Sequence, residues 1–145
     1  MIALQAQKAY DSSPTPERIG GKYGYMGTDH TIVIQPEFEA AWNFSDGLAR
    51  VRLDGKCGYI DKSGTVVIST QFEMRGDFSE GLAAVILADD KGRLKGGYID
   101  RLGNMAIPPR FDRNFNFHDG LAQVVIDRKI GYINKTGKYV WKPTK

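Results

Sequence analysis

An acidic residue precedes a Gly-Leu pair three times in the chain, as Asp46, Glu80 and Asp119. A row of carboxylates could bind a hard cation or a basic partner. Each acid, however, comes without a second oxygen ligand at fixed spacing, and an acid beside a turn glycine commonly accepts hydrogen bonds from nearby backbone amides. We therefore expect the three acids to cap local turns, and we predict neither a metal site nor a cofactor.

The histidines and the single cysteine do not form a catalytic pattern either. His30 and His118 stand at unrelated places in the sequence, so they predict neither a metal pair nor a general base. Cys57 has no cysteine partner for a disulfide, and no neighbouring histidine or helix start would activate its thiol. The glycine pairs 20–21 and 96–97 lead into expected strands, which argues against a phosphate-binding loop. We expect a protein that is not an enzyme.

The acids belong to a longer unit that recurs along the chain. A phrase of the form Phe-x-x-Gly-Leu-Ala, then a hairpin, then Gly-Tyr-Ile occurs at residues 44–60, 78–99 and 117–133. Counted from the glycine before a tyrosine (24, 58 and 97), phenylalanine follows after fourteen and twenty residues, and glycine follows after twenty-three. The residues concerned are Phe38, Phe72 and Phe111; Phe44, Phe78 and Phe117; and Gly47, Gly81 and Gly120. Such fixed spacing is the signature of a repeat architecture.

Each unit of about 34 residues predicts three short antiparallel strands. The first strands, 48–53, 82–87 and 121–126, alternate so that Ala49, Val51 and Leu53 and their equivalents face the core. The second strands carry Tyr59, Tyr98 and Tyr132, and the third strands cover 31–34, 66–68, 105–107 and 139–141. Proline cannot donate to a ladder, so we expect Pro36 and the pair 108–109 to end two of the third strands.

A three-stranded meander of this size cannot bury its own face, so consecutive units must stack or fan around an axis. We predict an all-β protein of tandem antiparallel meanders in an open superhelical or propeller-like array. The six recurring phenylalanines are the expected packing between units, because a buried aromatic ring removes about 150 to 250 Å² from water.

The repeat also sets the expected domain boundaries. Residues 1–20 are predicted as an N-terminal leader or cap, with a short helix over 1–12, and residues 21–145 as the repeat domain. Its units are expected at 21–54, 55–92 and 93–128, with a partial copy at 129–145. One unit is five residues longer than the others, and all five fall within 88–94, which predicts a lengthened surface hairpin loop.

The length fits one domain, and the distribution of charge bears on which class of partner the chain could bind. The 145 residues carry a net charge of +3, but residues 101–145 hold nine Lys or Arg against three Asp or Glu. This basic third could attract nucleic acid or another polyanion, although a solvated end cap is the favoured interpretation. No apolar run is long enough to span a membrane and no signal peptide is recognisable, so a cytoplasmic location is the default expectation.

The unit resembles the bacterial WG repeat, whose pattern joins a Phe-x-x-Gly-Leu-Ala strand, a lysine hairpin, a Trp-Gly-Tyr-Ile strand and an Asp-Lys-x-Gly turn. The likeness extends from about Gly21 to Trp141. One departure is consistent, because the slot of the family's tryptophan holds Tyr23, Cys57, Gly96 and Ile130. The resemblance implies an interaction module and no finer function.

Three features are candidates for specific binding. Trp42 and Phe115 share the position eighteen residues after the unit's first glycine with Gly76, which indicates either a pocket for sugar or peptide or a change of shape between units. Arg50 and Arg52 lie on the face of the first strand that varies between units. The long loop offers Asp89, Asp90, Lys91 and Arg93. We expect a noncatalytic module that binds another protein or itself; the alternative is a polysaccharide or polyanion site on the basic C-terminal third.

Overall fold

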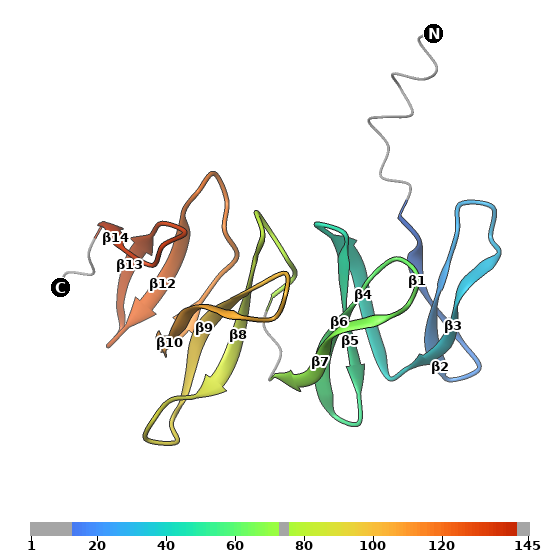
Figure 1. Ribbon diagram of the computed structural model, residues 1–145, viewed down its shortest axis with the longest axis horizontal. Helices are drawn as coiled ribbons and strands as arrows, with labels where there is room; N and C mark the ends of the chain where they lie inside the picture. Colours follow the sequence, from blue (N-terminus) through green and yellow to red (C-terminus); the bar gives the residue numbers. More distant parts are fainter. Residues whose placement is uncertain (1–12, 73–75, 142–145) are drawn as a thin grey trace, which may run out of the picture.

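The computed structural model describes residues 13–72 and 76–141 of the chain. These residues form strands, turns and loops with no helix among them, so the all-β prediction is confirmed. The helix expected over residues 1–12 lies outside the described residues. Four antiparallel sheets follow one another in an open row, with the first and the last at opposite ends (Figure 1).

The first sheet contains β1 (Thr15–Ile19), β2 (Lys22–Met26) and β3 (Ile32–Phe38). The second contains β4 (Ala40–Ser45), β5 (Leu48–Leu53), β6 (Lys56–Ile60) and β7 (Val66–Phe72). The third contains β8 (Leu82–Ala88), β9 (Leu94–Asp100) and β10 (Met105–Phe111). The fourth contains β11 (Arg113–Asn114), β12 (Ala122–Ile126), β13 (Lys129–Ile133) and β14 (Tyr139–Trp141).

The predicted meanders are present, and three further strands join them. β5–β7, β8–β10 and β12–β14 pair in chain order. In addition β4 and β11 pair with the first strand of their meanders, which makes two of the sheets four-stranded. β1 lies within the segment expected to be a leader or cap, and it pairs along all of β2, from Thr15 opposite Met26 to Ile19 opposite Lys22.

The expectation that proline ends the third strands is wrong. β3 continues through Pro36, and β10 continues through Pro108 and Pro109. The register against the neighbouring strand shifts at these places, so the prolines lie in irregular ladder segments where a missing N–H is tolerated. A Cβ on Gly24 would lie 2.5 Å from the Ile34 carbonyl oxygen and 2.8 Å from the Pro36 nitrogen, so the close approach of β3 requires glycine there.

The turns have the predicted chemistry. Asp54 and Gly55 both have positive φ angles, 51° and 77°, as a tight two-residue hairpin requires. In the next turn the Asp61 carboxylate accepts hydrogen bonds from the backbone amides of Ser63 and Thr65, at 2.9 and 3.0 Å. The Ser63 hydroxyl, which donates to the same carboxylate at 2.6 Å, and then these amides hold the pKa of Asp61 below its ordinary value.

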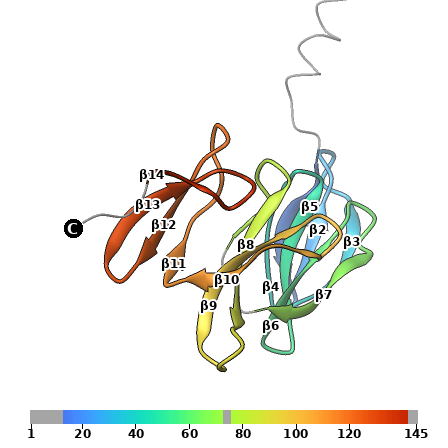
Figure 2. The same cartoon turned by 60° about the vertical axis from the view of Figure 1, so that its left-hand side comes forward.

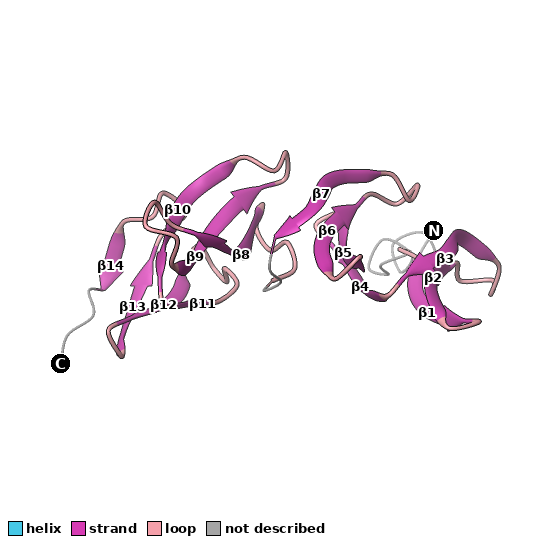
Figure 3. Ribbon diagram, turned by 90° about the horizontal axis from the view of Figure 1, so that it is seen from below, coloured by secondary structure: helices cyan, strands magenta, loops and turns pink. Residues whose placement is uncertain are grey.

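The four sheets follow one another along the row (Figure 3). The hydrophobic core is divided into three clusters, each formed mainly by residues of two consecutive sheets. One sheet supplies a tyrosine and an isoleucine, the linking segment supplies a phenylalanine, and the next sheet supplies alanine, valine and isoleucine. The clusters contain Tyr25, Ile34, Phe44, Ala49, Val51 and Ile60; then Tyr59, Ile68, Phe78, Ala83, Val85 and Ile99; then Tyr98, Ile107, Phe117, Ala122, Val124 and Ile133. Five of the six predicted phenylalanines are buried, and Phe72 lies outside the described side chains.

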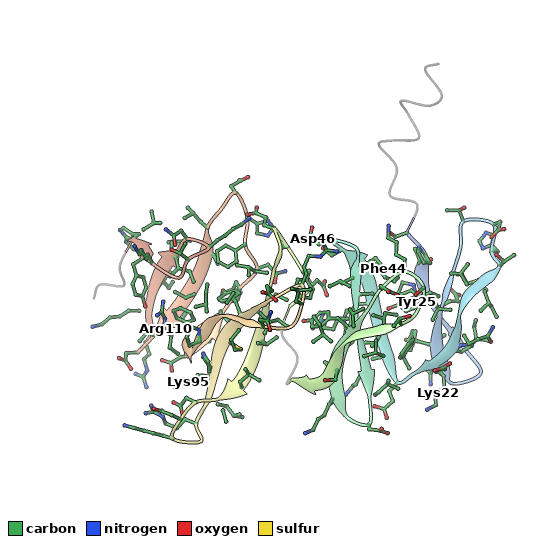
Figure 4. The ribbon with its side chains drawn as sticks, viewed as in Figure 1. Lys22, Tyr25, Phe44, Asp46, Lys95 and Arg110 are labelled. Atoms are coloured by element: carbon green, nitrogen blue, oxygen red, sulfur yellow. The ribbon has the colours of Figure 1, made fainter. Side chains whose placement is uncertain are left out.

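A buried tyrosine joins each sheet to the segment that follows it. Tyr25 lies beside Phe44, with ring centroids 5.2 Å apart, and its hydroxyl donates to the Trp42 carbonyl at 2.8 Å (Figure 4). Tyr59 and Tyr98 repeat both contacts one unit and two units later. Burial raises the pKa of all three hydroxyls above the ordinary tyrosine value, so they remain protonated donors.

Two phenylalanines close in sequence test whether the clusters stabilise the array. Phe117 is fully buried, whereas Phe115 is 41% exposed. Phe117→Ala should lower the free energy of unfolding by about 3–5 kcal/mol, because it leaves a cavity between the third and fourth sheets. Phe115→Ala should cost less than about 1 kcal/mol. Urea denaturation of both variants measures the difference, and equal losses would contradict the assignment.

Candidate functional site

Trp42 and Arg50, two of the predicted binding residues, lie together at the second sheet. The Arg50 guanidinium stacks over the Trp42 ring at 4.1 Å, and its Nε lies 3.3 Å from an Asp77 carboxylate oxygen. Arg50 is only 8% exposed. The pair therefore contributes a buried stacking and ionic contact beside the boundary of the second and third sheets.

The other predicted binding residues are dispersed. Arg52 is exposed and approaches the Gly55 carbonyl at the tip of its own hairpin, at 3.3 Å. Residues 89–93 form the predicted surface loop between β8 and β9, where the Asp89 carboxylate accepts from the Lys91 and Arg93 amides and pairs with the Arg93 side chain; Asp90 is exposed. Phe115 lies apart from both groups, directly after β11 of the fourth sheet.

Two of the three recurring acids cap backbone amides, but not in their own turns. The Asp46 carboxylate accepts from the amide of Gly81 at 2.7 Å, and the Glu80 carboxylate accepts from the amide of Gly120 at 2.8 Å. The prediction of local capping is therefore wrong, because each acid reaches the equivalent turn of the next unit. Asp46 lies on the side of the second sheet that is next to the third sheet (Figure 4).

A serine beside each acid makes a parallel contact. The Ser45 hydroxyl donates to the Phe78 carbonyl at 2.5 Å, and the Ser79 hydroxyl donates to the Phe117 carbonyl at 2.7 Å. A tyrosine of one sheet, together with a serine and an acid at the turn that begins that sheet's meander, therefore holds the Phe-x-x-Gly segment that leads into the next sheet.

The outer surface of the fourth sheet corresponds to the surfaces of the first three sheets that the next sheet covers. In the part of the chain that the structure describes, no further sheet covers it. We call it the terminal face and define it by five exposed apolar side chains: Phe115, Leu121, Ile130, Tyr132 and Trp141, which are 41%, 37%, 45%, 36% and 54% exposed. Figure 2 shows this sheet at the end of the row, after β8–β10. The Tyr132 and Trp141 rings lie 6.0 Å apart.

The equivalent positions of the third sheet are buried. Leu82, Tyr98 and Ile107 correspond to Leu121, Tyr132 and Trp141 by spacing, and they are 8%, 0% and 1% exposed because the fourth sheet covers them. A hollow of about 400 Å³ lies on the terminal face; Phe115, Asn116, His118, Asp119, Leu121, Gln123 and Tyr132 line it. A contiguous apolar surface beside polar groups is typical of an interaction site.

Sequence reasoning assigned Tyr132 to the scaffold, proposed Phe115 alone, and did not select Leu121, Ile130 or Trp141. A signal was nevertheless present. Four tyrosines stand at the second-strand position (25, 59, 98 and 132), but only three phenylalanines follow them at the packing position (44, 78 and 117). Among the described residues, the ring that lies beside the fourth tyrosine is that of Trp141 and not that of a phenylalanine.

The described residues also bear on other kinds of site. They contain no cluster of three or more histidine, cysteine, aspartate or glutamate side chains able to hold a metal ion. They include no helix long and apolar enough to cross a membrane.

Stacked sheets joined by repeated contacts between neighbouring units define a β-repeat protein, and the comparisons identify the repeat. A family model described as WG containing repeat matches residues 23–57, 58–91 and 97–129, which is most of the chain. The chain belongs to the WG repeat family. No curated protein and no solved structure matches it.

The contact between Glu80 and Gly120 predicts a pH effect. The Gly120 amide is the main cause that holds the pKa of Glu80 below its ordinary value of 4.5. A depressed carboxyl pKa stabilises the fold above the unfolded-state value, and this stabilisation is lost as the pH falls through the folded-state value. The free energy of unfolding of Glu80→Gln should therefore fall less than that of the original chain as the pH drops below about 4.5. Urea denaturation between pH 7 and 3 measures this free energy for both chains. The same pH dependence in both would contradict a stabilising role for the Glu80–Gly120 contact.

Proposed function

We propose that this WG repeat chain is a noncatalytic module that binds a protein through the terminal face. One observation carries the proposal: the terminal face is the fourth occurrence of a surface that a neighbouring sheet covers in the first three. The tyrosine and the third-strand isoleucine at these positions are buried wherever a sheet follows, as Tyr25 and Ile34, Tyr59 and Ile68, and Tyr98 and Ile107. Apolar surface that is normally buried is stabilised by contact with another apolar surface.

Burial of the apolar side chains of the terminal face provides a favourable free energy of association. A buried aromatic side chain removes about 150–250 Å² from water, so Tyr132 and Trp141 together offer several kcal/mol at about 25 cal/mol per Å². Association opposes this with lost translational and rotational freedom and with side-chain ordering. An interface that also covers Phe115, Leu121 and Ile130 adds further apolar area, which supports specific binding.

The absence of catalysis is part of the same proposal. Among the described residues, the recurring acids Asp46 and Glu80 already accept backbone amides of the next unit. The three deeply buried tyrosines are protonated donors to backbone carbonyls. These groups are explained by structural contacts, so the chain offers binding surface rather than reactive groups.

A polyanion site on the basic C-terminal third is the alternative. Lys135 of this third pairs with Glu80, and Lys95 nearby pairs with Asp112. These pairs reduce the charge available to a phosphate or sulfate chain. Binding to heparin that weakens steeply with salt would favour this alternative.

Site-specific photocrosslinking in cells tests the proposed function. A photoreactive residue at position 141 should give protein adducts, and Tyr132→Lys in the same chain should reduce them several-fold because it places a charge at the centre of the terminal face. The matched control is position 102, since Leu102 is 80% exposed but lies in a turn away from the terminal face. Adducts of equal strength from both positions, or insensitivity to Tyr132→Lys, would contradict the proposal.

A further inference from the structure

We infer that the terminal face is a receptor for the Phe-x-x-Gly turn of a further WG repeat. This inference rests on the proposed function and narrows it to one class of partner. It follows from how the same kind of turn is held twice within this chain, and from a third set of holding groups that stands at the open end.

The first complete set lies between the second and third sheets. The Tyr59 hydroxyl donates to the Gly76 carbonyl at 2.6 Å, and the Ser45 hydroxyl donates to the Phe78 carbonyl at 2.5 Å. The carboxylate next to that serine, in Asp46, accepts from the Gly81 amide at 2.7 Å. The Phe78 ring lies edge-on to the Tyr59 ring, with centroids 4.7 Å apart.

The second set repeats these contacts between the third and fourth sheets. The Tyr98 hydroxyl donates to the Phe115 carbonyl and the Ser79 hydroxyl to the Phe117 carbonyl, both at 2.7 Å. The Glu80 carboxylate accepts from the Gly120 amide at 2.8 Å. The Phe117 ring lies 5.0 Å from the Tyr98 ring. Two donors, one acceptor and one ring thus form a fixed recognition pattern.

The third set stands at the equivalent positions of the fourth sheet and of the turn that leads into it, and it lines the hollow on the terminal face: Tyr132, His118 and Asp119. His118 replaces the serine, and its ring N–H can also donate to a carbonyl. Within residues 13–72 and 76–141, no group hydrogen-bonds to the Tyr132 hydroxyl or to the Asp119 carboxylate. The groups that bind a Phe-x-x-Gly turn elsewhere are therefore available here.

The shape of the existing interfaces restricts the partner further. The large side chains of one sheet, such as Tyr98 and Ile107, pack against the small Ala122 and Val124 of the next. A partner strand must therefore carry Ala-x-Val after the turn. Two terminal faces would instead oppose large side chains to large ones, and they would bring two basic sheets together.

The first sheet of a second copy does not meet this requirement. Thr15 and Glu17 stand nine and seven residues before Gly24, where Ala49 and Val51 stand before Gly58. Both Ala49 and Val51 are fully buried. Burying the Glu17 carboxylate at the centre of such an interface would be unfavourable without a paired charge. A charge at this end opposes stacking of one copy on another, so the expected occupant is a WG repeat other than the first sheet of a second copy.

An extended chain tests the receptor directly. Residues 1–141 are followed by a second copy of residues 108–141, which continues the register because 34 residues separate Gly97 from Gly131. Both the extended chain and the original carry Trp42→Phe, and the added copy carries Trp141→Ile, so that only Trp141 of the original fourth sheet fluoresces. Acrylamide quenching of Trp141 should fall several-fold in the extended chain.

Asp119→Ala supplies the matched comparison. It should raise the unfolding equilibrium constant about tenfold in the extended chain, where the carboxylate gains an amide donor, and less than about twofold in the original. Glu80→Ala should act in both chains, because its partner Gly120 is present in both. Unchanged quenching of Trp141, or equal effects of Asp119→Ala in the two chains, would overturn the inference while leaving binding of a different protein surface open to the crosslinking test.

Sedimentation of the unmodified chain tests whether a second copy of this chain is the occupant of the terminal face. It should remain monomeric as its concentration is raised, whereas Thr15→Ala with Glu17→Val should cause concentration-dependent association that Asp119→Ala weakens. Association of the unmodified chain that Asp119→Ala weakens would identify a second copy as the occupant. That result would overturn this inference and still support a protein-binding function.

Discussion

The second, third and fourth sheets each have two apolar faces, and none of them can cover either face alone. The array therefore depends on contact between consecutive sheets, where a tyrosine of one sheet meets a phenylalanine from the segment that leads into the next. The ring contact excludes water, and the tyrosine hydroxyl satisfies a backbone carbonyl in the same place. Stability is consequently distributed over the boundaries rather than concentrated in one core.

The repeating unit in the sequence is not the same as the sheet in space. Residues 58–91, one family match, supply part of β6 with β7 to the second sheet and β8 to the third. The covalent chain thus crosses each boundary within a unit, and the hydrogen bonds of Asp46 and Glu80 cross it again. Each unit supplies strands to two neighbouring sheets. This explains why the residues that recur at the most constant spacing are those at the boundaries between sheets.

The periodic features were predictable because side-chain type and spacing determine them. Alternation placed Ala49 and Val51 in the core, and fixed spacing identified the buried phenylalanines. The ladder through Pro36 was not predictable, since it depends on how closely β3 approaches Gly24. The partners of Asp46 and Glu80 were missed because spacing does not reveal which copy a side chain faces. The terminal face has the same residue pattern as the covered faces, so only the number of sheets distinguishes it.

The open row also has a mechanical consequence. Because the first and last sheets lie at opposite ends (Figure 1), a pulling force between the chain ends acts on the three clusters in series, and the weakest boundary yields first. Release of one unit of about 34 residues would lengthen the chain by roughly 110 Å when extended, at about 3.3 Å per residue. Such a protein would absorb tension in separate steps and could restack each sheet on its unbroken neighbour.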